Sequence, residues 1–513
     1  MRARRTCGAG RAYGAWRAYG ALAAALLTTG CMVAGRVDAT ATSTPNVVVF
    51  FVDDLGWQDV GEPFGESRTH WNDRYHTPNL ARLCREGTKF TDAYAHPVCT
   101  PSRVSLMTGA AAARHRVSHW TLRADRWTDP ERSDLRRPRW NRSGLSNDPS
   151  TPEAYCSETL AQRFDAAGYQ TIMVGKAHFG AIGTPGADPT NLGFDVNIAG
   201  HAAGAPSSYL AAKSFLRGGK DTTWQVPGLE RYHGTDWFLT EALTDEAIAA
   251  AADAARDEQP FFLYLAHYAI HTPLNPDRRF IDAYRRAGLP ESEARYAALI
   301  EGMDRSLGRV LNWLDQAGLA EDTVVLFASD NGGLSAHARS GARHTHNAPL
   351  RSGKGSAYEG GVRVPLAARW PGRVPADRVE SLPVQLEDVM PTLCELCGVD
   401  PSCPDGDSFA EALLGGQKRQ HPLFFHSPHY WGATGPGIEP YSAVRDGDLK
   451  LIWFYDRGSA ELYDLKADIS EADDLARRRP DDVARLRRLL RDHLRACDAQ
   501  YPARDGGRAV RLP

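Results

Sequence analysis

Asn46-Val-Val-Val-Phe-Phe-Val52-Asp53-Asp54 is the stretch of sequence that decides the fold. Its β-branched and aromatic residues follow one another without a polar interruption, which is typical of a strand buried on both faces of a parallel sheet. Sheets of this kind occur in α/β proteins, where helices cover both faces. We therefore expect an α/β fold in which this stretch is an inner strand that ends at two carboxylates.

Three further apolar runs end in polar residues in the same way. They are Thr323–Ala328 before Ser329-Asp330-Asn331, Thr171–Val174 before Gly175-Lys176-Ala177-His178, and Phe261–Leu265 ahead of His271. In an open parallel sheet, ligands bind outside the carboxyl ends of the strands. All four polar clusters are therefore expected at one edge of the sheet.

Short side chains with oxygen ligands follow two of these runs, namely Asp53, Asp54, Asp330 and Asn331. Three carboxylates at one place repel one another unless a cation neutralises them. Oxygen ligands without a thiolate suit Ca²⁺ or Mg²⁺ better than Zn²⁺. Either pair alone is equally typical of a turn with a helix N-cap, so the pairs taken singly leave both interpretations open.

A second motif, Cys99-Thr-Pro-Ser-Arg-Val-Ser-Leu-Met-Thr-Gly109, combines Cys-x-Pro-Ser-Arg with Leu-x-Thr-Gly. Thr100-Pro101 by itself is typical of a helix start, but this leaves Cys99, Arg103 and Thr108-Gly109 unexplained. The motif resembles the signature of the type I, formylglycine-dependent sulfatases of the alkaline phosphatase superfamily. The resemblance implies a large mixed, mostly parallel central sheet flanked by helices, with a small C-terminal domain made of an antiparallel sheet and a helix.

The resemblance also implies the nucleophile and the metal. In this family a maturation enzyme oxidises the cysteine, here Cys99, to formylglycine, and one hydroxyl of the hydrated aldehyde attacks sulfur. The family's divalent-cation site corresponds to Asp53, Asp54, Asp330, Asn331 and the modified Cys99. We expect Ca²⁺ there, with Mg²⁺ as the alternative.

The catalytic side chains that the resemblance implies are Cys99, Arg103, Lys176, His178, His271 and Lys354. Arg103 and Lys176 match the partners of the formylglycine hydroxyl. His178 matches the residue that bonds the second hydroxyl, and we expect it to deprotonate that hydroxyl so that sulfate is expelled. His271 and Lys354 match the pair that holds sulfate and the leaving oxygen.

The resemblance implies a sulfatase. Together with the tryptophans and the export signal described below, it suggests action on a sulfated carbohydrate, either a polysaccharide or a glycosaminoglycan. One alternative is a phosphonate or phosphodiester hydrolase of the same superfamily, and another is an exported sugar-binding protein with a dead site. The formal net charge of −3 gives no global field that suggests nucleic acid. The two histidine pairs His267 with His271 and His344 with His346 also leave a transition-metal site open.

The insertion from Arg114 to Arg142 is rich in arginine and contains Trp120, Trp127 and Trp140. One interpretation is a loop that contacts an anionic sugar chain, with arginine on sulfate or carboxylate and tryptophan on sugar faces. The other interpretation is a solvated surface insertion.

The amino-terminal residues 1–39 predict an export signal. Arginines precede the apolar stretch Ala21–Leu27, which is too short to span a membrane, and Val37-Asp-Ala39 offers a cleavage site. We expect a periplasmic or extracellular protein without a transmembrane segment in the mature chain, and Cys31 leaves lipoprotein anchoring as the alternative. An oxidising compartment also allows a disulfide between two of Cys394, Cys397 and Cys403.

The order of predicted elements suggests a catalytic domain over residues 45–420 and a C-terminal domain over 421–513. In the first, helices are expected over 276–287 and 291–317, where apolar residues recur at helical spacing in the longer one. The C-terminal domain should contain a hairpin, a further strand and a basic amphipathic helix, over 441–455, 461–465 and 480–496.

Overall fold

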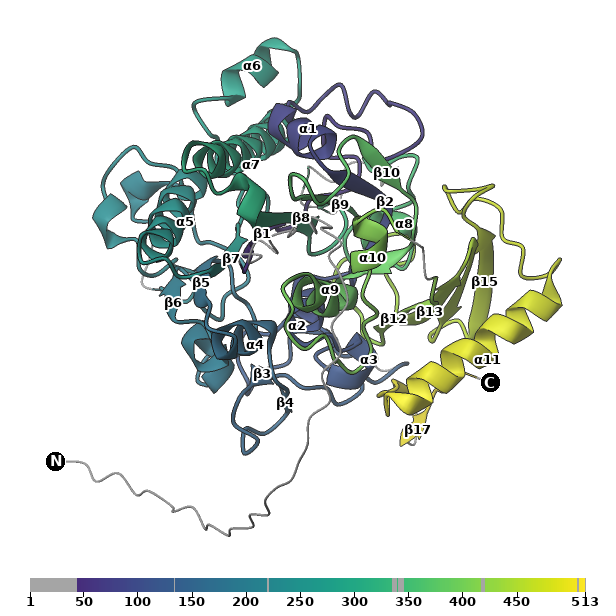
Figure 1. The fold of residues 1–513 in the computed structure, drawn as a ribbon. Helices are drawn as coiled ribbons and strands as arrows, with labels where there is room; N and C mark the ends of the chain where they lie inside the picture. The colour runs from purple at the N-terminus through teal and green to yellow at the C-terminus, as the bar shows by residue number, and fades with distance from the viewer. Residues whose placement is uncertain are drawn as a thin grey trace, which may run out of the picture. The chain divides into compact units, whose positions relative to one another are not determined.

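The four apolar runs form adjacent parallel strands inside a nine-stranded sheet, in the order β8-β1-β7-β5 (Figure 1). They span Asn46–Val52 in β1, Gln170–Gly175 in β5, Phe261–Ala266 in β7 and Thr323–Ser329 in β8. The structure is a computed structural model that describes residues 44–132, 134–218, 221–334, 339, 346–416, 420–504 and 507–512. The expected inner strand is confirmed, because every residue of β1 is buried.

Shorter strands extend the sheet on both sides. β6 continues it beyond β5 in parallel, whereas β9 runs antiparallel to both β8 and β2. β10 and β11 each pair with β2 in parallel. These strands span Thr88–Tyr94 in β2, Val196–Ile198 in β6, Arg363–Arg369 in β9, Arg378–Glu380 in β10 and Val384–Gln385 in β11. The sheet is therefore mixed but mostly parallel, as expected.

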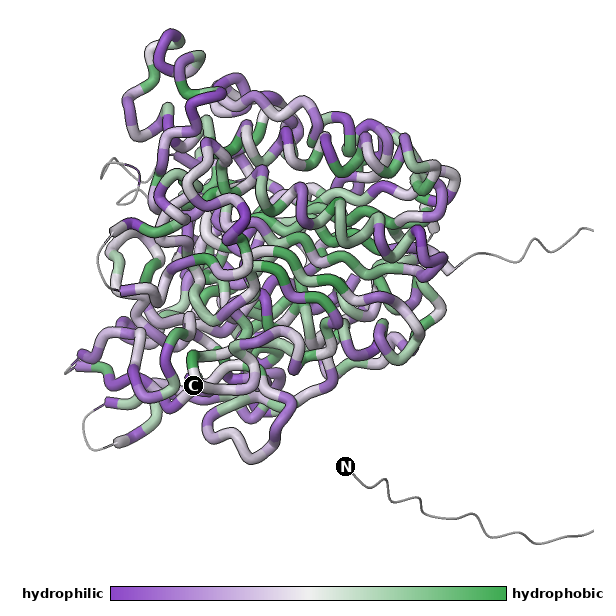
Figure 2. Tube along the Cα trace, turned by 90° about the vertical axis from the view of Figure 1, so that its left-hand side faces the viewer, coloured by the Kyte–Doolittle hydropathy of each residue, from purple (hydrophilic) through white to green (hydrophobic). Residues whose placement is uncertain are grey.

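Helices cover both faces of this sheet. Alternate residues of its inner strands point to opposite faces, and because both sets are apolar, each face needs a covering layer. Val48 and Phe50 of β1 belong to one apolar core, and Val47 and Val49 belong to another. Helices α1, α5 and α7 pack in the first core, and α2, α4 and α9 pack in the second (Figure 1). They span Pro78–Arg85 (α1), Cys99–Thr108 (α2), Leu160–Ala166 (α4), Leu239–Arg256 (α5), Glu291–Gln316 (α7) and Val389–Leu396 (α9). Figure 2 shows hydrophobic strands inside and more hydrophilic segments at the periphery.

A smaller antiparallel sheet follows in sequence, and helix α11 covers one of its faces (Figure 1). Its elements are β12 Leu423–Ser427, β13 Tyr441–Asp446, β14 Leu449–Phe454, β15 Ser459–Asp464 and α11 Pro480–Ala496. Leu486, Leu490 and Leu494 recur at helical spacing and share an apolar core with Val444 and Leu451. The predicted hairpin, strand and helix of this region are confirmed.

The helix expected over 276–287 is shorter than predicted, since α6 spans only Ile281–Arg286. Asp277 gives a physical reason. Its carboxylate accepts the backbone N–H of Arg279 at 3.1 Å and the Arg279 Nε at 2.9 Å. This local turn competes with a first helical turn at the same place.

The remaining described helices and strands are short. They are α3 Ala112–His115, α8 Glu359–Val362, α10 Ala410–Leu413, β3 Gly144–Ser146, β4 Ala154–Cys156, β16 Ala503–Arg504 and β17 Arg508–Ala509. Within the described ranges, no helix is both long and apolar enough to cross a membrane. The expected export signal and Cys31 lie outside the described residues, and the domain boundary near residue 420 stays a prediction.

The disulfide that the sequence allows among Cys394, Cys397 and Cys403 is not formed in this structure, where all three are free thiols. Cys403 instead donates its Sγ–H to the carbonyl oxygen of Gly406, at 3.2 Å. Its side chain also lies where a Cβ on Gly109 would stand, which places it against the end of α2.

A buried ion network joins the two sheets. Lys450 of β14 places its Nζ 2.8 Å from Glu359 Oε1 and 2.9 Å from Glu471 Oε1, and all three side chains are fully buried. Arg363, at the start of β9, also pairs with Glu359 at 3.2 Å. Two buried carboxylates near one lysine are stable only while the cation is present.

Lys450→Met is therefore expected to lower the free energy of unfolding by about 3–5 kcal/mol, because it leaves buried carboxylates without their cation. Denaturant titration followed by far-UV circular dichroism measures the change. Arg478→Met is the matched control, since Arg478 forms an exposed pair with Asp473 and should cost less than about 1 kcal/mol. Equal losses of unfolding free energy in both variants would contradict a stabilising role for the buried ion network.

Candidate active site

The polar side chains that follow the four central strands do lie together at one edge of the sheet. Backbone hydrogen bonds fix the strand ends, since Asp330 N donates to Val52 O at 3.1 Å and Lys176 N donates to Ala266 O at 2.7 Å. Asp53 N likewise donates to Ala269 O at 2.9 Å. The first bond links the end of β8 to β1, and the second links the end of β5 to β7. The pairing of the strands therefore fixes where Asp330 and Lys176 lie.

Asp53, Asp54 and Asp330 form a fully buried acidic cluster whose carboxylate oxygens approach within 4.8 Å of one another. Asn331 joins it by donating its side-chain N–H to Asp54 Oδ1 at 2.9 Å. One oxygen each of Asp53, Asp54 and Asn331 has no hydrogen-bond partner within the described part of the chain. Orphaned buried oxygens in a cluster of like charges fit a hard divalent cation, for which Ca²⁺ and Mg²⁺ are the suitable ions.

Three buried cations surround this cluster, each beside one carboxylate. The pairs are Lys176 Nζ with Asp53 Oδ2 at 2.7 Å, Arg103 Nε with Asp330 Oδ2 at 2.9 Å, and Lys354 Nζ with Asp54 Oδ1. Arg103 also donates to the carbonyl oxygen of Lys176 at 2.6 Å. The three cations offset part of the repulsion and hold the carboxylates in place.

The pKa values show that the three cations do not offset the burial of the carboxylates equally, since the pKa of Asp53 is raised and that of Asp54 is lowered. Burial raises the pKa of Asp53 well above its usual value, and the neighbouring carboxylates add to the effect against the attraction of Lys176. Burial also disfavours the ionised form of Asp54, but Lys354 and His271 outweigh it and hold the pKa of Asp54 below its usual range. A divalent cation at the orphaned oxygens would favour the ionised form of Asp53 as well.

Cys99, the first residue of α2, lines a cavity of about 660 Å³. His178, His271 and Lys354 line the same cavity. Burial raises the pKa of the Cys99 thiol, so the unmodified side chain is a weak thiolate nucleophile at neutral pH. The expected nucleophile and three of its expected partners therefore share one space.

His178 is held in a single orientation at this cavity. Its Nε2 lies 2.7 Å from the carbonyl oxygen of Thr121, which only accepts, so Nε2 carries the proton and Nδ1 is left as an acceptor. Burial, reinforced by Lys176, lowers the pKa of His178 well below its usual value. Gly204 makes room for the ring, because a Cβ there would lie 2.2 Å from the His178 Cε1.

Three tryptophans, Trp120, Trp224 and Trp431, also line the cavity. Trp431 comes from the segment after β12, and its ring packs so closely on Gly355 that a Cβ there would lie 2.3 Å from it. The Nζ of Lys354 lies 5.8 Å from the centre of the same ring. The wall of the cavity is therefore aromatic and includes a residue of the C-terminal region.

A buried chain of hydrogen bonds joins the two segments that carry Trp120 and Trp431. The Oγ of Ser118 lies 2.7 Å from His429 Nε2, and His429 Nδ1 lies 2.9 Å from Asp129 Oδ2. Ser118 is two residues before Trp120, and His429 is two residues before Trp431. All three members are buried, so we assign this Ser-His-Asp chain a positioning role that joins the two segments.

The insertion from Arg114 to Arg142 matches neither of its two interpretations throughout. Trp140 is only 1% exposed and donates to Asp129 Oδ1 at 3.3 Å, so it contacts neither solvent nor a sugar. Trp127 packs beside the guanidinium groups of Arg137 and Arg142, at 4.6 and 4.1 Å from its ring centre. Of the three tryptophans in the insertion, Trp120 is the one that lines the cavity.

The histidine pairs do not add a transition-metal site to the described residues. His267 is fully buried and its Nε2 lies 2.8 Å from Ser306 Oγ, while His271 Nε2 lies 3.7 Å from Asp54 Oδ2. No metal-binding group within the described ranges includes either residue. His344 lies outside the described residues, so its pairing with His346 stays untested.

Sequence reasoning missed four features of the site, namely Gly204, Trp224, Trp431 and the chain through His429. No local motif marks them, because their contacts are with residues outside their own segment of the sequence. The Trp431 contact with Gly355 and the His429 contacts with Ser118 and Asp129 are examples.

Comparison with known proteins assigns both parts of the chain. The sulfatase family model matches residues 45–399, and the model for the C-terminal part of N-sulphoglucosamine sulphohydrolase matches residues 353–500. The chain is 28% identical to a sulfatase of Formosa agariphila over 89% of its length and 88% of that protein. It is 32% identical to arylsulfatase A of Homo sapiens, over 81% of this chain and 76% of the relative. The crystal structure of Ps i-CgsB superposes with a TM-score of 0.70 at 26% identity, over 88% of this chain and 93% of that one.

Gly204→Ala is expected to displace the His178 ring, because the added methyl has no other space. A displacement of about 1 Å near reacting atoms costs up to roughly 100-fold, so kcat/KM for an aryl sulfate should fall about 10- to 100-fold. The melting temperature, measured in parallel, should change little. Parent-like kinetics in this variant would show that the position of His178 does not matter.

Proposed function

Because this chain belongs to the sulfatase family and is a sulfuric ester hydrolase, we propose that it removes sulfate from a carbohydrate with a formylglycine nucleophile made from Cys99. The single observation that carries the proposal is the orphaned oxygen cluster beside the Cys99 cavity. The cavity offers a place for the sulfate ester, and the cluster offers a place for the cation.

Asp53, Asp54, Asp330 and Asn331 would hold the divalent cation, for which we propose Ca²⁺, with Mg²⁺ as the alternative. Such an ion polarises sulfate oxygens as a Lewis acid and stabilises the charge that develops on them. Their orphaned oxygens and the absence of a thiolate in the acidic cluster support a hard ion.

Cys99 is the residue that a maturation enzyme would oxidise, and the hydrated aldehyde supplies one hydroxyl to attack sulfur and a second to expel sulfate. The raised pKa of the thiol supports this assignment over direct thiolate catalysis. The start of α2 holds the side chain in the cavity, where the oxidised group would meet the substrate.

The chain's own side chains then have separate tasks. Lys176 and Arg103 keep the carboxylates aligned through their ion pairs, and their positive charge favours a deprotonated hydroxyl at residue 99. His178 presents its unprotonated Nδ1 as a base for the second hydroxyl. His271 and Lys354 border both the cavity and Asp54, so they reach the sulfate oxygens, and one of them protonates the leaving alcohol.

A sulfated carbohydrate is the substrate class that fits this cavity. Aromatic rings bind the apolar faces of sugars, and three tryptophans line the wall. The similar Ps i-CgsB structure has also been solved in complex with k-i-k-neocarrahexaose. We infer action on such chains outside the cytoplasm, in the periplasm or beyond the cell, which agrees with the export signal expected over residues 1–39.

Cys99→Ser is expected to lower aryl sulfate turnover by about 10³-fold or more, because serine cannot supply the second hydroxyl. Mass spectrometry of the peptide that contains residue 99 should find formylglycine in active parent enzyme and an unmodified thiol in enzyme made without a maturation system. Cys156→Ser, which changes an exposed cysteine, is the control. Full activity of the unmodified thiol form would overturn the mechanism, and faster turnover of an aryl phosphonate than of an aryl sulfate would favour the alternative hydrolase.

Asp330→Asn is expected to weaken cation binding at least roughly tenfold, because it removes a charged ligand while keeping the size of the side chain. Elemental analysis of the dialysed protein measures the metal content directly, apart from activity. Chelation of the parent protein should have the same effect, with Ca²⁺ restoring turnover. Active parent enzyme that contains no divalent cation would refute the cation site.

A further inference from the structure

A second cavity, of about 480 Å³, adjoins the catalytic cavity. Ser207, Arg217, Thr272 and Pro273 line both cavities, so the two spaces share a wall made of these residues. We call the second space the side cavity. Thr272 directly follows His271, which places this wall beside a residue to which we assign a role in the reaction.

The side cavity carries an excess of positive charge. Lys213, Arg217 and Arg295 line it, against a single carboxylate, Glu291. Glu291 is already engaged, because its carboxylate accepts from Arg295 at 2.8 Å and from Arg285 at 2.9 and 2.8 Å. Lys213 and Arg217 have no carboxylate partner within the described ranges, so two cations remain for a ligand.

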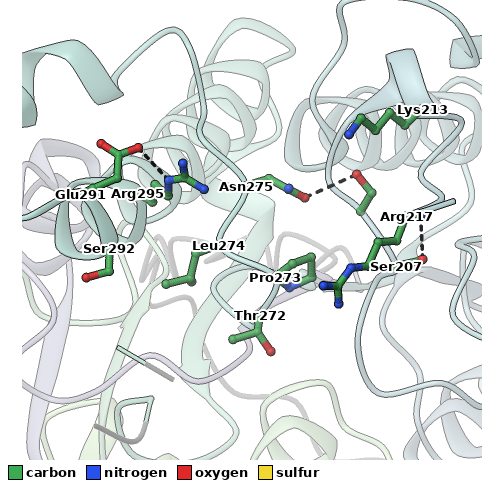
Figure 3. A pocket seen from close by; sticks show the side chains of 11 residues that line it. Ser207, Lys213, Arg217, Thr272, Pro273, Leu274, Asn275, Glu291, Ser292 and Arg295 are labelled. Carbon is green, nitrogen blue, oxygen red and sulfur yellow. Dashed lines mark hydrogen bonds and ion pairs between the residues drawn. The ribbon is translucent and has the colours of Figure 1, made fainter. Parts of the chain in front are cut away.

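The two free cations stand on one side of the side cavity, and the Glu291–Arg295 pair stands on the other (Figure 3). Figure 3 shows the guanidinium of Arg217 directed towards Pro273, at the junction with the catalytic cavity. The backbone N–H of Arg217 donates to Ser207 Oγ at 2.8 Å, which anchors this segment. The backbone of Arg217 is therefore anchored beside the junction, and its exposed guanidinium can reach a ligand there.

The rest of the lining suits a sugar ring. Ser208, Asn275 and Ser292 offer neutral polar groups, and Leu274 and Pro273 offer apolar surface. Asn275 Oδ1 accepts the backbone N–H of Tyr209 at 2.9 Å, which fixes the orientation of its amide. A mixture of oriented polar groups and apolar surface is what a small-ligand site requires.

We propose that the side cavity is a subsite for a second anionic group, a sulfate ester or a carboxylate, on the sugar next to the one that loses its sulfate. The inference rests on the proposed function and adds the substrate class, an oligosaccharide with negative charge on adjacent units. Arg217 and Lys213 bind the anion by charge-assisted hydrogen bonds. Such contacts lie away from the reacting sulfur, so they select the substrate without taking part in the reaction.

Three probes separate the two sources of anion. The κ-carrageenan disaccharide has one sulfate, the ι-carrageenan disaccharide has a second sulfate on the neighbouring sugar, and a monosulfated chondroitin disaccharide has a carboxylate there. Affinities are measured by calorimetry with the inactive Cys99→Ala protein, and kcat/KM is measured with matured enzyme. The binding arm does not depend on turnover, so failure of the subsite and failure of the proposed function are distinguishable.

Parent protein should bind at least one doubly charged probe roughly tenfold more tightly than the singly charged one, as charge-assisted contacts allow. The double variant Arg217→Gln/Lys213→Gln should lose this preference, and the preference of the parent should shrink as salt rises. Arg256→Gln, the control, removes an exposed charge from α5. This variant should retain the preference for the doubly charged probe. The doubly charged probe that gains affinity identifies the anion as sulfate or carboxylate.

Equal affinity of the parent for singly and doubly charged probes would overturn the subsite, as would an equal loss for all probes in the double variant. If matured enzyme releases sulfate from none of the three probes while the binding preference is present, the subsite stands and the proposed substrate class falls.

Discussion

The need to keep three carboxylates together out of water is the constraint on which this site depends. Asp53, Asp54 and Asp330 are fully buried and lie within reach of one ion. Like charges at this distance disfavour ionisation unless positive charge is fixed beside them, and Lys176, Arg103 and Lys354 supply part of it. The surrounding fold fixes the three carboxylates and the three cations at the positions where their charges offset one another.

The parallel sheet determines these positions. β8, β1, β7 and β5 are neighbours, so residues from four distant parts of the chain reach the same edge. α2 then begins beside this edge with Cys99 as its first residue. The chemistry is thus carried by strand ends and a helix start, which are rigid, while the tryptophans that shape the cavity come from connecting segments.

Much of this arrangement was predictable because its signals are local. The uninterrupted run from Val47 to Val52 and the leucines that recur every four residues in α11 each specify an element by themselves. Polar residues after parallel strands are expected to meet. The positions of Trp140, Trp431 and His429 were not predictable, because they depend on contacts between segments far apart in sequence, such as Ser118 with His429 and Trp431 with Gly355. The prediction that a helix begins at residue 276 was wrong for a different reason. A single side chain, Asp277, offers the backbone a competing turn, so α6 begins later.

The placement of Trp431 has a consequence for how such an enzyme can diversify. The proposed acid–base groups and the proposed metal ligands all precede residue 360, whereas part of the cavity wall comes from the segment after β12. Part of the recognition surface therefore comes from a part of the chain that carries none of the proposed catalytic residues. Exchange or drift of the C-terminal part can reshape which sugars enter, while the chemistry inherited from the sheet stays the same.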